Sequence, residues 1–244
     1  MKTRFFFLFV ILATSLGHVF ASVKSDLETA SKNGNAVFLV VSDPDVSGTD
    51  QAVQIANQAK LKMPNSVVIQ MNRSDEANDE LVAKYRLAGA PLPLVLVIAS
   101  NGIVSGGFVL SQVTPELLVN AVPSPKKADV LKTLSEGKSV FIVVTGKTMA
   151  EKNTIMNTCQ KACIEMENNA RMIEISLDDP IESQFLTELK VNKTATEPMT
   201  YVINSKGQIT GTFTDEVNST TLVATANKVA ASGCCPSGSK TGCK

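Results

Sequence analysis

The chain of 244 residues has no tryptophan and one histidine, His18. His18 lies in an amino-terminal segment that we expect to be removed, so the mature chain would have no histidine. That absence excludes serine–histidine and cysteine–histidine nucleophilic pairs, histidine general bases and histidine metal ligands. Aromatic residues make up 5% of the sequence, too few for a surface on which sugars or bases stack.

The chain also lacks an excess of either charge, because 23 basic residues balance 23 acidic ones. Loss of Lys2 and Arg4 with the amino-terminal segment would leave the mature chain slightly acidic. Nucleic-acid binding depends on a basic surface that neutralises phosphates. We therefore expect no nucleic-acid partner.

The residues at 1–21 have the pattern of a secretory signal peptide. Lys2 and Arg4 precede an apolar run at 5–13, and Val-Phe-Ala at 19–21 resembles a cleavage site. The rival interpretation is an uncleaved membrane anchor, but the apolar run is well short of the ~20 residues that a spanning helix needs. We predict cleavage after Ala21, no membrane span in the mature chain, and export to the periplasm or the extracellular space.

The chain repeats itself. The segment Gly-Asn-Ala-Val-Phe-Leu-Val-Val at 34–41 matches Gly-Lys-Ser-Val-Phe-Ile-Val-Val at 137–144. Pro-Leu-Val-Leu-Val-Ile at 93–98 matches Pro-Met-Thr-Tyr-Val-Ile at 198–203, and a weaker match between 79–87 and 183–191 lies between these two in the same order. Self-similarity of this kind predicts two copies of one domain.

Each copy shows the same alternation of helical and strand patterns. Apolar β-branched runs predict buried strands, and Asn-Gly at 101–102 predicts a hairpin turn. We expect Ser25 and Ser74 to cap two of the helices. In the first copy we expect helices at 25–32, 49–62, 74–86 and 114–120, and strands at 37–41, 67–71, 94–99 and 103–109. In the second copy we expect helices at 127–136, 148–168, 181–191 and 219–231, and strands at 140–145, 171–177, 199–204 and 208–213.

This element order resembles thioredoxins, as does the segment Lys-Tyr-Arg-Leu-Ala-Gly-Ala-Pro at 84–91, which is similar to the thioredoxin segment that carries a cis-proline. The resemblance covers both copies and implies an α/β fold class with two tandem thioredoxin-like domains, each a central mixed sheet flanked by helices. We place these domains at 22–122 and 127–232. A short, stiff linker at 123–126 would join them, and a flexible cysteine-containing tail at 233–244 would follow.

The resemblance also implies a cis-proline before the hairpin, on an edge that binds peptides. Pro91 fits the spacing from the preceding helix, whereas Pro93 fits the spacing to the hairpin and has a repeat partner in Pro198. We therefore favour Pro93 and Pro198. The alternative is that these prolines only lock a turn.

Thioredoxin catalysis requires Cys-x-x-Cys at the start of the helix after the first core strand, where the helix dipole lowers a thiol pKa. The first copy has Ser-Asp-Pro-Asp-Val-Ser-Gly-Thr there, at 42–49, and the second has Thr-Gly-Lys-Thr-Met-Ala-Glu, at 145–151. Neither contains cysteine, so we predict no catalytic residue at either place. Asp43 and Asp45 could bind calcium weakly, but we favour a solvated loop that caps the next helix.

The chain has five cysteines, all in its second half. Cys159 and Cys163 lie four residues apart on one face of a predicted helix. They are a candidate thiol pair for redox chemistry or metal binding, and the alternative that we favour is two small buried hydrophobes. The other three lie in the Gly/Ser-rich tail, and their thiolates are a candidate site for a soft cation such as Cu(I), Zn(II) or Hg(II): Cys234, Cys235 and Cys243. A structural disulfide, or one to another chain, is the alternative for the tail.

Three functions follow from these features. We favour an exported, non-catalytic scaffold that binds a protein partner, because the resemblance extends to the non-catalytic domains of protein disulfide isomerases. The first alternative is soft-metal binding through the cysteines of the tail. The second is a thiol–disulfide oxidoreductase that uses the tail as a tethered arm.

Overall fold

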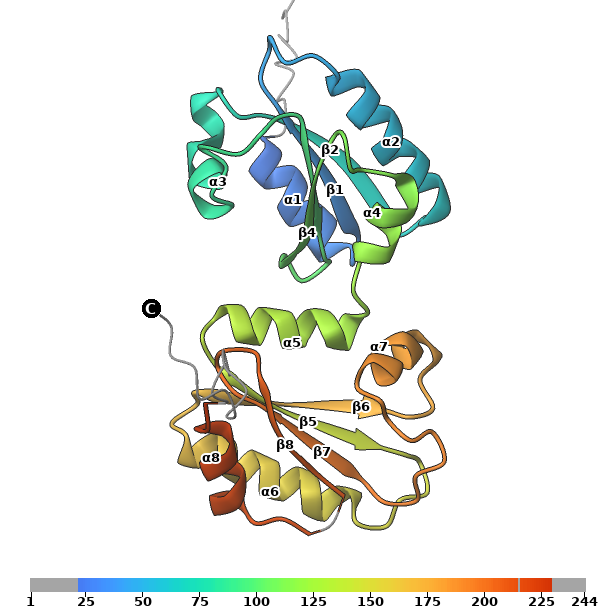
Figure 1. Cartoon of the computed structure of the whole chain (residues 1–244), viewed down its shortest axis with the longest axis vertical. Helices are drawn as coiled ribbons and strands as arrows, with labels where there is room; N and C mark the ends of the chain where they lie inside the picture. Colours follow the sequence, from blue (N-terminus) through green and yellow to red (C-terminus); the bar gives the residue numbers. More distant parts are fainter. Residues whose placement is uncertain (1–21, 215, 230–244) are drawn as a thin grey trace, which may run out of the picture.

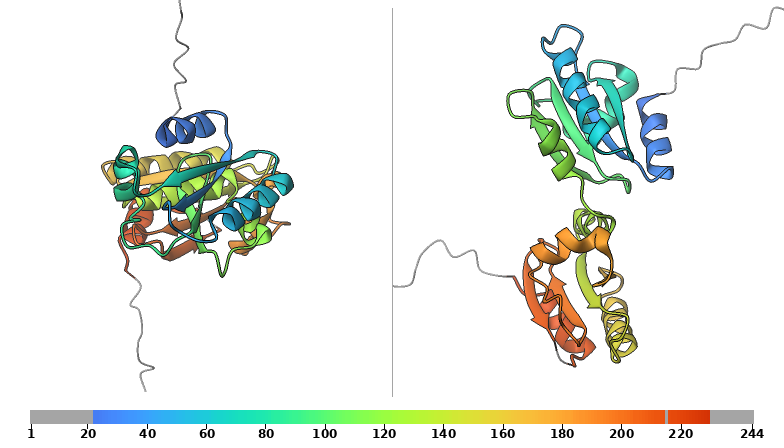
Figure 2. Two further views of the ribbon diagram at one scale, coloured as in Figure 1. Left: turned by 90° about the horizontal axis from the view of Figure 1, so that it is seen from above. Right: turned by 90° about the vertical axis from the view of Figure 1, so that its right-hand side faces the viewer.

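The computed structural model describes residues 22–214 and 216–229. They form two domains stacked end to end, each built around a four-stranded sheet (Figures 1 and 2). The predicted signal peptide at 1–21 and the three cysteines of the tail lie outside the described residues. Within the described ranges, no helix combines the length and the apolar character needed to cross a membrane.

The first domain has one mixed sheet in the order β2-β1-β3-β4. Strand β1 runs parallel to β2 and antiparallel to β3, and β3 runs antiparallel to β4. In chain order, the elements are α1 (Val23–Lys32), β1 (Ala36–Ser42), α2 (Thr49–Lys62), β2 (Ser66–Asn72), the 3-10 helix η1 (Glu76–Asn78), α3 (Asp79–Lys84), β3 (Leu94–Ile98), β4 (Val104–Val109) and α4 (Pro115–Ala121).

The second domain repeats this plan, with a sheet in the order β6-β5-β7-β8 and the same strand directions. Its elements are α5 (Pro125–Ser135), β5 (Ser139–Thr145), α6 (Lys152–Glu165), β6 (Ala170–Ser176), η2 (Pro180–Glu182), α7 (Ser183–Glu188), β7 (Met199–Ile203), β8 (Ile209–Phe213) and α8 (Ser219–Ala226). The strand order and directions confirm the predicted fold class of two thioredoxin-like domains.

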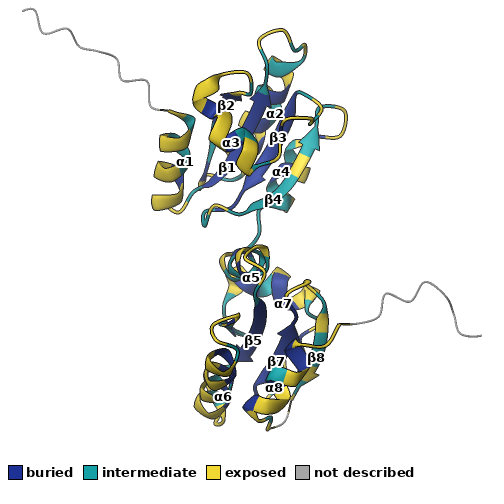
Figure 3. Cartoon of the chain, turned by 90° about the vertical axis from the view of Figure 1, so that its left-hand side faces the viewer, coloured by how far each residue is buried: buried dark blue, intermediate teal, exposed yellow. Residues whose placement is uncertain are grey.

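Each central strand is buried on both faces, as its unbroken apolar run predicts. The side chains of β1 from Val37 to Val41 are at most 2% exposed, and those of β5 from Val140 to Val144 are fully buried. Alternate residues of β1 belong to two cores, one beneath α1 and α3 and one beneath α2 and α4. Figure 3 shows the buried central strands of the two sheets with helices beside them. Burial of each large aliphatic side chain contributes about 1.5–3 kcal/mol, so these strands hold the layers together.

Several helix ends differ from the sequence-based expectation, and the capping contacts explain the differences. Helix α1 begins at Val23 because Ser22, not Ser25, is its N-cap: the Ser22 hydroxyl accepts the Ser25 N–H at 3.2 Å. Helix α5 begins at Pro125, inside the segment expected to be the linker. Proline is tolerated at a first helical position, where its missing N–H would have no intrahelical partner.

The helix expected at 74–86 is instead a 3-10 turn followed by a short helix. Asp75, not Ser74, caps the turn by accepting the Ala77 N–H at 3.0 Å. Arg86 has a φ of 56°, which ends the helix, and Lys190 has the same φ at the equivalent place in the second domain. Such left-handed positions cannot continue a right-handed helix.

Candidate functional site

In the first domain, the loop that follows β1 holds a partly buried ion pair between Asp43 and Arg73 in place of a cysteine pair. Asp43 accepts hydrogen bonds from the Arg73 guanidinium at 2.5 Å and from the Ser74 hydroxyl at 2.8 Å. Arg73 also donates to the carbonyl oxygens of Leu87 at 3.4 Å and Ala90 at 3.0 Å. Arg73 therefore ties the loop after β1 to the loop before β3.

Electrostatics at Asp43 keep its carboxyl group ionised. Desolvation is the largest single effect and raises the pKa. The hydrogen bonds from Ser74 and Arg73, together with the Arg73 charge, outweigh it and hold the pKa of Asp43 below its usual value. The pairing of this carboxylate with Arg73 and the exposure of Asp45 favour a solvated loop over a calcium site.

In the second domain, the equivalent loop also has no cysteine. The Thr145 hydroxyl donates to Glu174 at 2.8 Å, and Lys152 contacts the same carboxylate at 2.7 Å. The hydrogen bond from Lys152 is the main reason that the pKa of Glu174 is lowered. Met149 folds over the start of the loop, where its sulfur accepts the Gly146 N–H at 2.9 Å. These contacts stabilise the loop, which has no thiol for exchange.

The two predicted prolines differ. The Leu92–Pro93 peptide bond is cis, and no other cis bond occurs in the described parts of the chain. The expectation of a cis bond before Pro198 is therefore wrong. Trans is the intrinsically favoured isomer of any X-Pro bond, and the loop that leads to β7 is longer than the one that leads to β3. Both prolines are buried, and a peptide-binding role for this edge stays a prediction.

Cys159 and Cys163 lie in the apolar core between α6, β5, β7 and α8. They are 0% and 4% exposed and form no disulfide. Desolvation raises the pKa of Cys159 to about 12 and also raises the pKa of Cys163. Because the thiolate is the reactive form, these thiols are unsuited to exchange or to metal binding in the folded state.

No cluster of three or more Cys, His, Asp or Glu side chains suited to a metal ion occurs in residues 22–214 and 216–229. The candidate ligands Cys234, Cys235 and Cys243 lie outside those ranges.

A groove lies between α1 and α3 of the first domain. It has a volume of about 320 Å³. Apolar side chains from both helices and from β1 and β3 form its floor: Leu27, Val37, Leu81, Tyr85 and Ile98. Charged side chains form its rim: Lys24, Glu28, Lys32, Glu80 and Lys84. An apolar floor with a charged rim suits one or two apolar side chains of a ligand whose polar parts stay in water.

Two contacts shape the rim of this groove. Lys24 on α1 and Glu80 on α3 form an ion pair at 2.8 Å, which raises the pKa of Lys24 and lowers that of Glu80. Lys84 lies 5.2 Å from the centre of the Tyr85 ring, within the range of a cation–π contact. Tyr85 is half-buried, and desolvation raises its pKa. The ion pair between Lys24 and Glu80 thus links α1 and α3 at the surface, and the groove separates the two helices below it.

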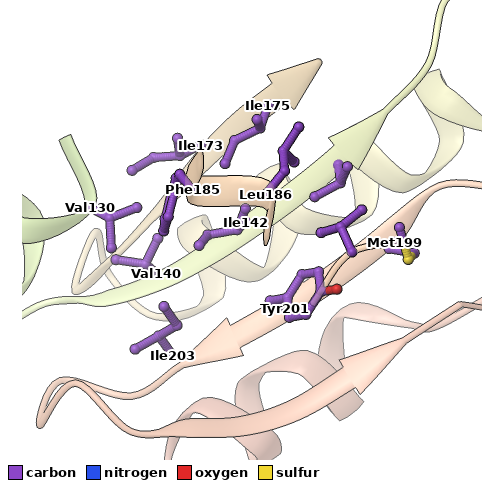
Figure 4. Packing of buried hydrophobic residues seen from close by; sticks show 12 residues of the cluster. Val130, Val140, Ile142, Ile173, Ile175, Phe185, Leu186, Met199, Tyr201 and Ile203 are labelled. Carbon is purple, nitrogen blue, oxygen red and sulfur yellow. The ribbon is translucent and has the colours of Figure 1, made fainter. Parts of the chain in front are cut away.

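In the second domain, larger apolar side chains take up part of the equivalent space, and a cavity of about 350 Å³ remains between α5 and α7. The repeat offset places Leu134 where the first domain has Ser31, and Phe185 where it has Leu81. Phe185 packs beside Val130 in the core (Figure 4). A Cβ built on Gly207 would lie 3.9 Å from Leu134, whereas one on the equivalent Gly102 would have no atom within 4 Å.

This groove was not predicted from the sequence. Its lining residues are spread from Lys24 to Gly102 and carry no motif. The sequence signal for the groove was a difference in side-chain size between the two repeats. The first repeat has Ser31 and Leu81 where the second has the larger apolar residues Leu134 and Phe185.

Comparisons with known proteins bear on the fold. No protein-family model matches the chain, and no curated protein matches it. Similar solved structures include the first two thioredoxin domains of Saccharomyces cerevisiae Eps1p, at 11% identity over 85% of this chain and 96% of that chain, with a TM-score of 0.31. Human ERp44 in a zinc-bound form is 12% identical over 82% of this chain and 55% of that chain, with a TM-score of 0.35.

The oxidoreductase DsbH is 15% identical over 46% of this chain and 82% of that chain, with a TM-score of 0.31. Such values carry no argument about function, and the fold assignment rests on the strand order and pairing of this chain. By that topology, the chain consists of two consecutive thioredoxin-like domains, and neither has the cysteine pair after its first strand.

Proposed function

We propose that this protein is an exported, non-catalytic protein-binding module, and that the groove between α1 and α3 holds a segment of its partner. The observation that carries the proposal is the groove of the first domain, where Leu27 and Tyr85 are half-buried above an apolar floor. In the second domain, Leu134 and Phe185 take up part of the equivalent space, and a cavity of about 350 Å³ remains beside Phe185. Burial of apolar surface is favourable, so a partner side chain that entered the groove would stabilise the complex.

The chemistry of the rest of the chain supports binding over catalysis. Both loops that would hold a cysteine pair are closed by ion pairs, through Asp43 in one domain and Glu174 in the other. The buried thiols Cys159 and Cys163 have raised pKa values. The groove itself has a volume of about 320 Å³, within the usual range of ligand sites, ~300–1,000 Å³.

The substitution Ser31→Leu tests this proposal because it places in the groove the side chain that the second domain has there. The exposed Thr29 on the same helix does not line the groove, so Thr29→Leu is the matched control. The probe is fluorescently labelled, reduced and carboxymethylated α-lactalbumin, which stays unfolded, and binding to the mature chain is followed by anisotropy. We expect Ser31→Leu to weaken binding and Thr29→Leu to leave it unchanged. Equal binding by both variants, or no binding by the unsubstituted chain, would contradict the proposal.

Export is the second part of the proposal. Cleavage after Ala21 would leave Ser22, the N-cap of α1, as the first residue. The intact mass of the protein recovered from the exported fraction should correspond to residues 22–244. A full-length mass, or retention in the cytoplasm, would contradict this part and leave the groove untouched.

A further inference from the structure

The groove between α1 and α3 is shorter than an extended segment of an unfolded partner. Helix α1 has 10 residues, so the groove beside it is about 15 Å long. An extended chain advances about 3.3 Å per residue, and roughly four or five residues fill that length. A longer segment must therefore leave the groove at one of its ends.

One end of the groove is crossed by an ion pair. Lys24 and Glu80 lie in the first turns of α1 and α3, and their charged groups are 2.8 Å apart. The pair joins the two helices at the surface. A chain that left the groove at this end would have to pass over the pair or break it.

The other end of the groove is open. Gly102, in the turn between β3 and β4, lines the groove and is exposed. A Cβ built on Gly102 would have no atom within 4 Å. The Ser31 hydroxyl on α1 donates to the Ser100 carbonyl oxygen at 2.6 Å, so the end of α1 and this turn form one continuous surface. A bound segment can therefore leave beside Gly102 without displacing a side chain.

Helix α5 of the second domain lies next to this open end. The Lys132 ammonium on α5 donates to the Asn101 carbonyl oxygen at 3.4 Å. Figure 1 shows α5 beneath the first domain, with its last turn on the side of α3. Lys132, Ser135 and Glu136 are exposed in that part of the molecule. A segment that leaves beside Gly102 meets these side chains first.

These side chains suit the backbone of an extended segment. Such a backbone carries N–H and C=O groups that need hydrogen-bond partners. The Lys132 ammonium can donate to a carbonyl oxygen, and the Glu136 carboxylate can accept an N–H. The Ser135 hydroxyl donates to the Lys132 carbonyl oxygen at 2.7 Å, and its oxygen can accept an N–H. The groove thus takes apolar side chains, and α5 takes polar groups of the same segment.

We propose that a partner segment held in the groove leaves it beside Gly102 and continues over Lys132, Ser135 and Glu136 of α5. Both domains then contact one extended polypeptide. This inference rests on the proposed function and adds the direction of the segment and the contribution of the second domain.

The test is photo-cross-linking from a benzophenone maleimide on Ser135→Cys. The three cysteines of the tail are replaced by serine in the mature chain. Cys159 and Cys163 are buried and have raised pKa values, so they should not take up the label. The probe is reduced and carboxymethylated α-lactalbumin, the unfolded protein used above.

Two control sites are exposed and receive the same label. Glu76→Cys lies in η1, beyond the end of the groove that the ion pair crosses, and Thr187→Cys lies on α7 of the second domain. On irradiation, we expect the probe to cross-link to the label at Ser135→Cys and to neither control. Addition of Ser31→Leu should abolish the cross-link, whereas addition of Thr29→Leu should not.

Two results would overturn the inference. Cross-linking from Glu76→Cys in place of Ser135→Cys would mean that the segment leaves at the other end. Equal cross-linking from Thr187→Cys would mean that the contact is not confined to α5. If the label on Ser135→Cys itself prevents binding, and the labels at the two controls do not, the contact with α5 is supported.

The anisotropy measurement separates this inference from the proposed function. If Ser31→Leu weakens binding of the probe but Ser135→Cys gives no cross-link, the path over α5 is wrong and the binding function of the groove stands. If the unsubstituted chain does not bind the probe, both are wrong.

Discussion

At the scale of single residues, Arg73 has a structural role at the place where a catalytic thioredoxin has its reactive cysteines. Its guanidinium joins Asp43 to the carbonyl oxygens of Leu87 and Ala90, which belong to a different loop. In a thioredoxin-like fold these two loops flank the place where a cysteine pair would sit. An ion pair with several hydrogen bonds in that position holds the loops together and leaves no reactive group between them.

The substitution Asp43→Asn tests this role through its pH dependence. The folded-state pKa of Asp43 is lowered from 3.8, so the carboxylate stabilises the fold above that pH, and the contribution is lost as pH falls through the lowered folded value. We expect a lower melting temperature for Asp43→Asn at pH 7. The difference from the unsubstituted chain should shrink below pH 3.8. Asp45→Asn, at an exposed position, is the control, and an equal effect of both changes would argue against a clasp at Asp43.

For Cys159 we expect the opposite pH dependence, with a loss of stability at alkaline pH. Burial raises its pKa from 9.0 to about 12, so the unfolded chain releases a proton above pH 9 that the folded chain keeps. Stability from this group is therefore complete below pH 9 and falls by up to about 1.4 kcal/mol per pH unit up to pH 12. Urea denaturation between pH 7 and 11 should show a shallower alkaline loss for Cys159→Ala. The tail cysteines should be replaced by serine in both proteins. Alkylation of Cys159 in the native protein at pH 8, at the rate of an exposed thiol, would contradict the prediction.

At the scale of elements, the start of α5 depends on a side chain from η2. Ser124 is the N-cap of α5 but makes no side-chain capping bond, and Glu182 supplies the acceptor instead. The carboxylate also lies at the positive end of the helix dipole. At the equivalent position of the first domain, Asn78 donates to the Asn72 carbonyl oxygen at 2.8 Å, and α1 is capped locally by Ser22.

The substitution Glu182→Ala should destabilise the second domain by about 1–3 kcal/mol, because it leaves two half-buried donors, the Ser124 hydroxyl and the Lys126 N–H, without this acceptor. Glu182→Gln keeps an oxygen for the Lys126 N–H and should cost less. Hydrogen exchange of the amides of α5, compared with those of α1, is the measurement. Equal protection of α5 in the alanine and glutamine variants would show that the carboxylate does not cap this helix.

At the scale of the whole molecule, the two domains share one fold but differ in what they leave open. Few polar contacts join them directly: Asn101 donates to Asp129 at 3.3 Å, and Lys132 donates to the Asn101 carbonyl oxygen at 3.4 Å. The chain at 120–124 forms one wall of the cavity beside α5 and α7. We therefore expect the first domain to carry the binding activity and the second to act as its support.

Deletion of residues 233–244 tests whether the cysteine tail contributes. Native mass spectrometry of the mature chain with Zn(II) or Cu(I) would count bound ions. Since the described residues hold no suitable cluster of ligands, any bound soft metal should disappear with the tail, and binding of unfolded α-lactalbumin by the groove should not change. A metal ion retained after the deletion would place its site on the domains.

The sequence by itself determined the fold. Three patterns can be recognised in the sequence: the internal repeat, the apolar runs that form β1 and β5, and the hairpin signal at 101–102. A central strand that is buried on both faces also requires a layer of helices on each side of its sheet. The lack of Cys-x-x-Cys in both loops is also a matter of composition, so the absence of dithiol chemistry there needed no structure.

Only the tertiary structure decided which surface is open. The groove depends on whether Ser31 or a leucine, and Leu81 or a phenylalanine, fill the space between two helices that are distant in the sequence. The capping of α5 by Glu182 was likewise set by a contact across the fold. Periodicity reports which face of an element is apolar, but side-chain volumes that meet in space decide whether that face is filled.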